Sequence, residues 1–154
     1  MTRVESDVRP HLVSGTTYLA ADSETKKLRA LIQDDFFTAD LYLPLLGVEY
    51  VTYRLEQMGR FIDWSDIRPR PAGVWHQLLK GRSGVTVKVT PKTGSIMEYQ
   101  TDSGEGIVGY VEAVTPGEDV TLASVGRYSN GQYLVETLPK EAWQALRPVW
   151  LQIQ

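Results

Sequence analysis

The chain contains no cysteine among its 154 residues. Disulfides, thiolate metal ligands and cysteine nucleophiles are therefore excluded. Histidine is scarce as well, since only His11 and His76 are present. A zinc site usually takes three or four protein ligands, and two histidines so far apart in the sequence make a poor one. We therefore expect no metal and no other cofactor.

Long hydrophobic runs are also missing. The most apolar stretch, residues 41–51, is interrupted by Pro44, Gly47 and Glu49 and is too short to cross a bilayer. Residues 1–10 carry charges of both signs and lack the apolar run of a signal peptide. We expect no membrane partner and no secretion, and we place the protein in the cytoplasm or inside a virion or another assembly.

Neither sign of charge dominates the chain. The net charge is −3, and apolar residues make up 42% of the composition, as in ordinary soluble globular proteins. Residues 84–154 hold 5 basic and 8 acidic side chains. Contacts with phosphate need local positive charge, so this half is poorly suited to broad nucleic-acid binding.

The apolar residues change period near Gly81 and Gly84. Before these glycines they recur every three or four positions, as on one face of a helix, and after them they alternate, as in Val85, Val87 and Val89. The pattern predicts an α+β fold with a helical region over 1–83 and a β-rich region over 84–154, packed as one compact unit.

Two helices and a short third one are predicted in the first half. One begins near Asp22 or Ser23, which can cap it. The next spans residues 44–58 and ends at Gly59, which tolerates a left-handed conformation. Residues 61–71 contain two prolines and predict an irregular connection to a short helix over 72–80.

Six short strands are predicted in the second half, over 85–90, 96–100, 107–114, 120–128, 132–138 and 149–153, with a short helix over 139–146. Asn130-Gly131 suits the two positive φ angles of a type I′ hairpin turn. This series resembles a small SH3-like barrel in architecture. We expect the helical half to pack on such an antiparallel barrel or on a curled sheet.

A glycine pattern at the β half resembles a phosphate-binding loop. Residues 104–111 match G-x-G-x-x-G-x-V. The lysine strand and metal-binding acids that accompany this loop in kinases are missing, and the dinucleotide version needs a helix where a strand is predicted here. We interpret the pattern as a loop that leads into a strand.

Basic and aromatic side chains are interleaved over residues 60–82. Arginine, tryptophan and tyrosine carry much of the binding energy at protein interfaces, so this segment predicts a protein-binding surface for a second copy or another subunit. The expected partner-binding residues are Tyr53, Arg60, Trp64, Arg68, Arg70, Trp75 and Arg82. The function predicted on this basis is a non-catalytic structural or adaptor subunit of a larger assembly, such as a virion or connector component, and not an enzyme.

Two alternatives stay open. Residues 60–82 are also suited to a nucleic-acid-binding module, because arginines can clamp phosphates and aromatic rings can stack on bases. Asp63 and Asp66 weaken that attraction. A small enzyme with carboxylate chemistry is the other alternative, using Asp34, Asp35 and Asp40, or Asp63 and Asp66 with His76.

Overall fold

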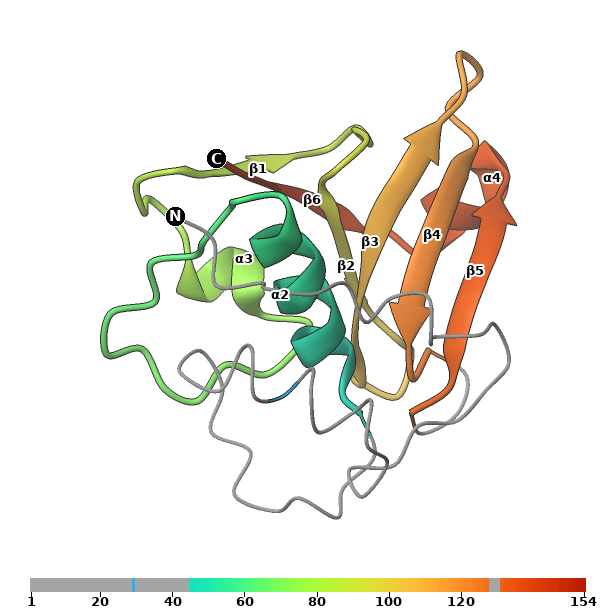
Figure 1. Cartoon of the computed structure of the whole chain (residues 1–154). Coiled ribbons are helices and arrows are strands. Elements are labelled where there is room, and N and C mark those ends of the chain that lie inside the picture. The colour runs from blue at the N-terminus through green and yellow to red at the C-terminus, as the bar shows by residue number, and fades with distance from the viewer. Residues whose placement is uncertain (1–28, 30–44, 128–130) are drawn as a thin grey trace.

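Six strands form one antiparallel sheet (Figure 1). The computed structural model describes Arg29, residues 45–127 and residues 131–154. In chain order the strands are β1 (Val85–Lys88), β2 (Ile96–Gln100), β3 (Gly106–Val114), β4 (Val120–Val125), β5 (Tyr133–Leu138) and β6 (Val149–Ile153). Their order across the sheet is β1-β6-β2-β3-β4-β5, so the last strand of the chain lies between the first two.

Short helices cover both faces of this sheet (Figure 1). On one face lie α2 (Gly47–Gln57) and α3 (Trp75–Leu78), and on the other lies α4 (Lys140–Ala145). Successive residues of a strand point to opposite faces. Accordingly, Ile96 belongs to the core under α2 and α3, while its neighbour Met97 belongs to the core under α4. Strand β2 is therefore buried on both faces.

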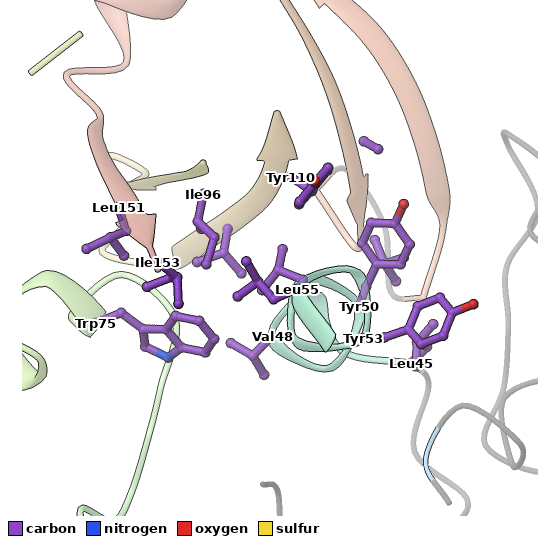
Figure 2. Close-up of a cluster of buried hydrophobic side chains, with 14 of the residues drawn as sticks. Leu45, Val48, Tyr50, Tyr53, Leu55, Trp75, Ile96, Tyr110, Leu151 and Ile153 are labelled. Atoms are coloured by element: carbon purple, nitrogen blue, oxygen red, sulfur yellow. The ribbon is translucent and has the colours of Figure 1, made fainter. Parts of the chain in front are cut away.

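The larger core lies between α2, α3 and the sheet (Figure 2). Leu55 of α2 and Trp75 of α3 are fully buried there, together with Ile96 and Leu151 of the sheet. Full burial of such side chains stabilises a fold by about 1.5–3 kcal/mol each. The smaller core on the other face is built around Trp143 and Trp150, whose rings meet edge to face.

Helix α2 is held to the sheet by a buried arginine. The Arg54 guanidinium donates to both carboxylate oxygens of Glu112 and to the Tyr50 hydroxyl. It also lies 4.2 Å from the centroid of the Tyr110 ring. Glu112 sits at a β-bulge between β3 and β4. Burial alone would lower the pKa of Arg54, but its bonds to Glu112 and Tyr50 raise it above the usual value. This arginine therefore stays charged.

A second buried ion pair ties an earlier part of the chain to α2. The Arg29 guanidinium donates to both carboxylate oxygens of Glu49, at 2.6 and 2.7 Å. Glu49 also accepts the backbone amide of Leu46 at the start of the helix. Two buried charges of opposite sign satisfy each other here, so that neither is left unpaired away from water.

The predicted architecture is wrong in two respects. The sheet is open, because β1 and β5 form its edges and do not pair with each other, so it is not an SH3-like barrel. A helical half packed on the sheet is not present either, since the described helical residues of 1–83 are Arg29, α2 and α3, and α3 has four residues. Part of this half is irregular chain whose apolar residues Ile62, Trp64 and Ile67 also pack into the core. Apolar spacing reports burial, which extended chain can also achieve.

The individual helices and strands match the predictions from the sequence more closely than the architecture does. Helix α2 stops before Gly59, which has a φ of +72°, and residues 61–71 are irregular as predicted. All six strands occur near their predicted positions. Of the helix predicted from Asp22 or Ser23, Arg29 is described and is helical, and the rest lies outside the described residues. None of the helices in the described part is long and apolar enough to span a membrane.

The β4–β5 hairpin is present, but its turn differs from the prediction. The register pairs Val125 with Tyr133, and the Gly126 amide donates to the Gln132 carbonyl. A two-residue turn at 130–131 would instead place Gln132 opposite residue 129. Asn130 lies outside the described residues, and Gly131 has a φ of +70°.

The glycine pattern over residues 104–111 allows close backbone packing. A Cβ atom at Gly106 would lie 1.8 Å from the carbonyl oxygen of Ala72, and one at Gly109 would lie 2.8 Å from the Leu122 side chain. The segment before α3 therefore rests directly on the start of β3. These glycines bring two parts of the chain together, which accounts for the spacing without a phosphate.

Replacing Gly106 with alanine should destabilise the protein by about 1–3 kcal/mol or more, because overpacking forces backbone to move. The matched control is Gly117→Ala, where a Cβ atom meets nothing closer than 3.9 Å. Denaturant unfolding of both variants measures the difference. Equal stability of the two variants would contradict the close approach.

Candidate active site

A buried carboxylate on β2 organises the candidate site. Glu98 is 0% exposed, and β2 is paired on both sides, with β3 and β6. Its carboxylate accepts the backbone amides of Gly73, Trp75 and His76 at 2.9–3.0 Å. A buried charge is tolerated only when it is well hydrogen-bonded. Glu98 thereby fixes the segment that leads into α3.

The fourth bond to Glu98 comes from an imidazole. His76 Nδ1 lies 2.7 Å from Glu98 Oε1. A carboxylate only accepts hydrogen bonds, so Nδ1 carries the proton, and in the neutral ring Nε2 is then the basic nitrogen. The His76 side chain is 30% exposed, whereas Glu98 is fully buried. The pair therefore presents an oriented base at the surface.

This pair borders a cleft of about 830 Å³. Pockets for small molecules usually span about 300–1,000 Å³, so the cleft can hold a ligand of that size. Its walls come from α3, from the end of β2, and from the segment that joins α4 to β6. The lining residues are Gly73, His76, Gln77, Glu98, Tyr99, Gln100, Thr101, Asp102, Arg127, Ala145, Leu146, Arg147 and Val149.

Two arginines lie on the cleft in different environments. Arg127 binds the Glu136 carboxylate and donates to the Tyr99 hydroxyl at 2.7 Å. Burial would lower the pKa of Arg127, but these two bonds raise it above the usual value, so its charge is permanent and already compensated. Arg147 is exposed and has a φ of +54°, which is uncommon for a residue other than glycine. Among the described residues, no carboxylate forms an ion pair with Arg147.

All three of the predicted partner-binding aromatics lie in the core. Tyr53, Trp64 and Trp75 are at most 3% exposed, so they cannot contact a partner in this fold. The Trp64 and Trp75 rings meet edge to face, and the Arg70 guanidinium lies 4.8 Å from the Trp64 ring centroid. Trp75 also donates its indole N–H to the Arg70 carbonyl. The prediction took these residues for an exposed surface, whereas they form the packed interior of this segment.

The other predicted arginines stabilise loops or face solvent. Arg60 donates to the Gly94 carbonyl at 3.3 Å, and Arg82 donates to the Asp63 carbonyl and the Ser65 hydroxyl. Arg68 is exposed. Partner binding through these three stays a prediction.

The predicted acids do not join His76. Its partner is Glu98 and neither Asp63 nor Asp66, both of which are exposed. His11, Asp34, Asp35 and Asp40 lie outside the described residues. Within the part of the chain that the structure describes, no three His, Asp or Glu side chains come together as a metal site.

Replacing Glu98 with glutamine should destabilise the protein by about 2 kcal/mol or more, because hydrogen bonds to a charged group are worth about 1.5–3 kcal/mol and the new amide N–H faces donors. Glu105→Gln is the matched control, since Glu105 is exposed in the neighbouring loop. Urea unfolding followed by circular dichroism gives the two free energies. A Glu98→Gln variant as stable as the control would show that the carboxylate is not needed.

The comparisons with known proteins are confined to the fold. No protein-family model and no curated protein matches the sequence. Among solved structures, an N-acetylmuramoyl-L-alanine amidase from Staphylococcus aureus is similar, with a TM-score of 0.59 and 21% identity. The likeness covers 71% of this chain and 31% of that one, so this chain spans about a third of the amidase structure. At this identity the likeness shows a shared fold.

This neighbour contradicts the prediction that the chain is not an enzyme, because a solved structure of similar fold is an enzyme. It gives no support to the predicted role in a virion or connector. Of the functions considered from the sequence, the alternative of a small enzyme is the one that this neighbour favours.

Proposed function

We propose that the protein is a hydrolase that cleaves an amide bond with a water molecule activated by His76. The observation that carries the proposal is the hydrogen bond of 2.7 Å between His76 Nδ1 and the buried Glu98. A carboxylate that holds the far nitrogen of an imidazole orients the ring and stabilises its protonated form, as in the triads of hydrolases. The cleft beside the ring provides room for a substrate.

The roles follow from the geometry. His76 Nε2 takes a proton from water as the water oxygen bonds to the amide carbonyl carbon. The tetrahedral intermediate then loses its C–N bond, and the same nitrogen returns the proton to the leaving amine. Glu98 is a positioning residue, because its oxygens are all engaged within the fold. The products are a carboxylic acid and an amine.

The choice of an amide rests on the fold neighbour. An amidase shares this fold, so an N-acetylmuramoyl-L-alanyl peptide is the first substrate to test. The shared fold supports this choice of substrate. The Glu98–His76 geometry is what supports hydrolytic chemistry in this chain.

Replacing His76 with glutamine should lower the rate of amide cleavage by about 100-fold or more, because a positioned general base contributes about 10²–10⁴-fold. The assay follows the release of a free amine from an N-acetylmuramoyl-L-alanyl peptide. Lys80→Gln is the matched control, since Lys80 is exposed just beyond α3. Circular dichroism of both variants confirms folding.

Two results would overturn the proposal. One is amide cleavage that is equally fast in His76→Gln and in Lys80→Gln. The other is the absence of cleavage by the unaltered protein on both N-acetylmuramoyl-L-alanyl and simple acetyl-peptide substrates.

A further inference from the structure

The cleft lies at a break in the ladder between β2 and β6. These strands pair Ile96 with Leu151, Met97 with Trp150 and Glu98 with Val149, and pairing ends there. Continuing this register would bring Gln100 opposite Arg147. Arg147 instead donates its amide to Gln144 and adopts a φ of +54°, so the chain leaves the line of β6. Tyr99 and Gln100 of β2 are left without a neighbour on this side.

The alternation of the ladder shows where the backbone of Gln100 points. On the other side of β2, the Val111 amide donates to the Ser95 carbonyl and the Thr101 amide donates to the Glu105 carbonyl. In an antiparallel pair every second residue bonds to the same neighbour, so the odd-numbered residues of β2 bond to β3. The N–H and C=O of Gln100 therefore point away from β3, toward the cleft. Among the described residues, neither group has a backbone partner.

Two exposed charged side chains also lie at this break. Arg147 and Asp102 are the exposed charged side chains of the cleft lining, while Glu98 and Arg127 are already bonded within the fold. Arg147 lies on the segment that leaves the sheet beside Gln100, where an extended chain would pass. A guanidinium with free donors suits a carboxylate.

We infer that the cleft binds a short, extended peptide that carries a carboxylate. This inference rests on the proposed function and names its substrate class. The peptide continues the line of β6 past Val149, exchanges two backbone hydrogen bonds with Gln100, and places its carboxylate on Arg147. Addition of a strand to an open sheet edge is a common mode of peptide recognition. It also holds the peptide amides alongside His76.

The test measures binding to the full chain carrying His76→Gln, so that the probe is not consumed. The probe is acetyl-trialanine with a free C-terminal carboxylate, and its carboxamide is the comparison. In a second substitution, Gln100→Pro removes the backbone N–H, whereas Gln100→Ala keeps it. Both remove the side-chain bond to the Gly73 carbonyl, so they form a matched pair. Proline is tolerated where a strand faces no neighbour.

Titration calorimetry should show Gln100→Pro binding the carboxylate probe about five- to tenfold more weakly than Gln100→Ala, as expected for one lost hydrogen bond. Arg147→Ala should lower the affinity for the carboxylate probe to that for the carboxamide. Asp102→Asn should not weaken binding. If Gln100→Pro fails to fold, a probe with an ester in place of its central amide removes the matching peptide donor and should show the same loss.

The outcomes separate this inference from the proposed function. Equal binding of both probes, or equal binding to Gln100→Pro and Gln100→Ala, overturns the inference even if the unaltered protein cleaves amides through His76. The expected binding pattern without any cleavage supports the inference and overturns the proposed function. A probe with a side-chain carboxylate and an amidated end shows whether the carboxylate must be terminal.

Discussion

The burial of one carboxylate at the centre of the sheet sets the geometry on which the candidate site depends. Glu98 lies on a strand that is paired on both sides, so water cannot satisfy its oxygens. Three backbone amides and one imidazole do so instead. Because these donors come from residues 73–76, the carboxylate determines both where α3 begins and how His76 is oriented. Glu98 therefore both stabilises the fold around α3 and orients the imidazole of the candidate site.

Close packing of backbone supports this arrangement. The Ala72–Gly73 segment reaches Glu98 only because it rests on Gly106, where no side chain stands in the way. The same segment continues into Trp75, whose ring is fully buried against Trp64. The aromatic side chains near the site thus hold its scaffold in place. Their burial explains why a region rich in tryptophan and arginine does not present those tryptophans to a partner.

The open sheet provides the space in which that chemistry can operate. A closed barrel would pair every strand along its length, whereas here β6 begins at Val149 and leaves the end of β2 uncovered. The cleft forms at this point, between α3 on one face and the end of α4 on the other. The cleft has an exposed charged rim and free backbone groups of Gln100 because β6 starts only at Val149. The proposed substrate class follows from that local geometry and from the exposed Arg147.

Local patterns in the sequence determined the strands, helix α2 and the irregular segment 61–71, because alternation, helical spacing and proline act over a few neighbouring residues. They could not determine the sheet order or the open architecture, which depend on pairing between distant strands. Nor could they find the site. Glu98 and His76 are 22 positions apart and meet only after β2 is buried. Asp63 and Asp66, the partners predicted for His76, are nearer to it in the sequence but are exposed. Only the tertiary structure decides which carboxylate is buried away from water and therefore needs the histidine as a hydrogen-bond donor.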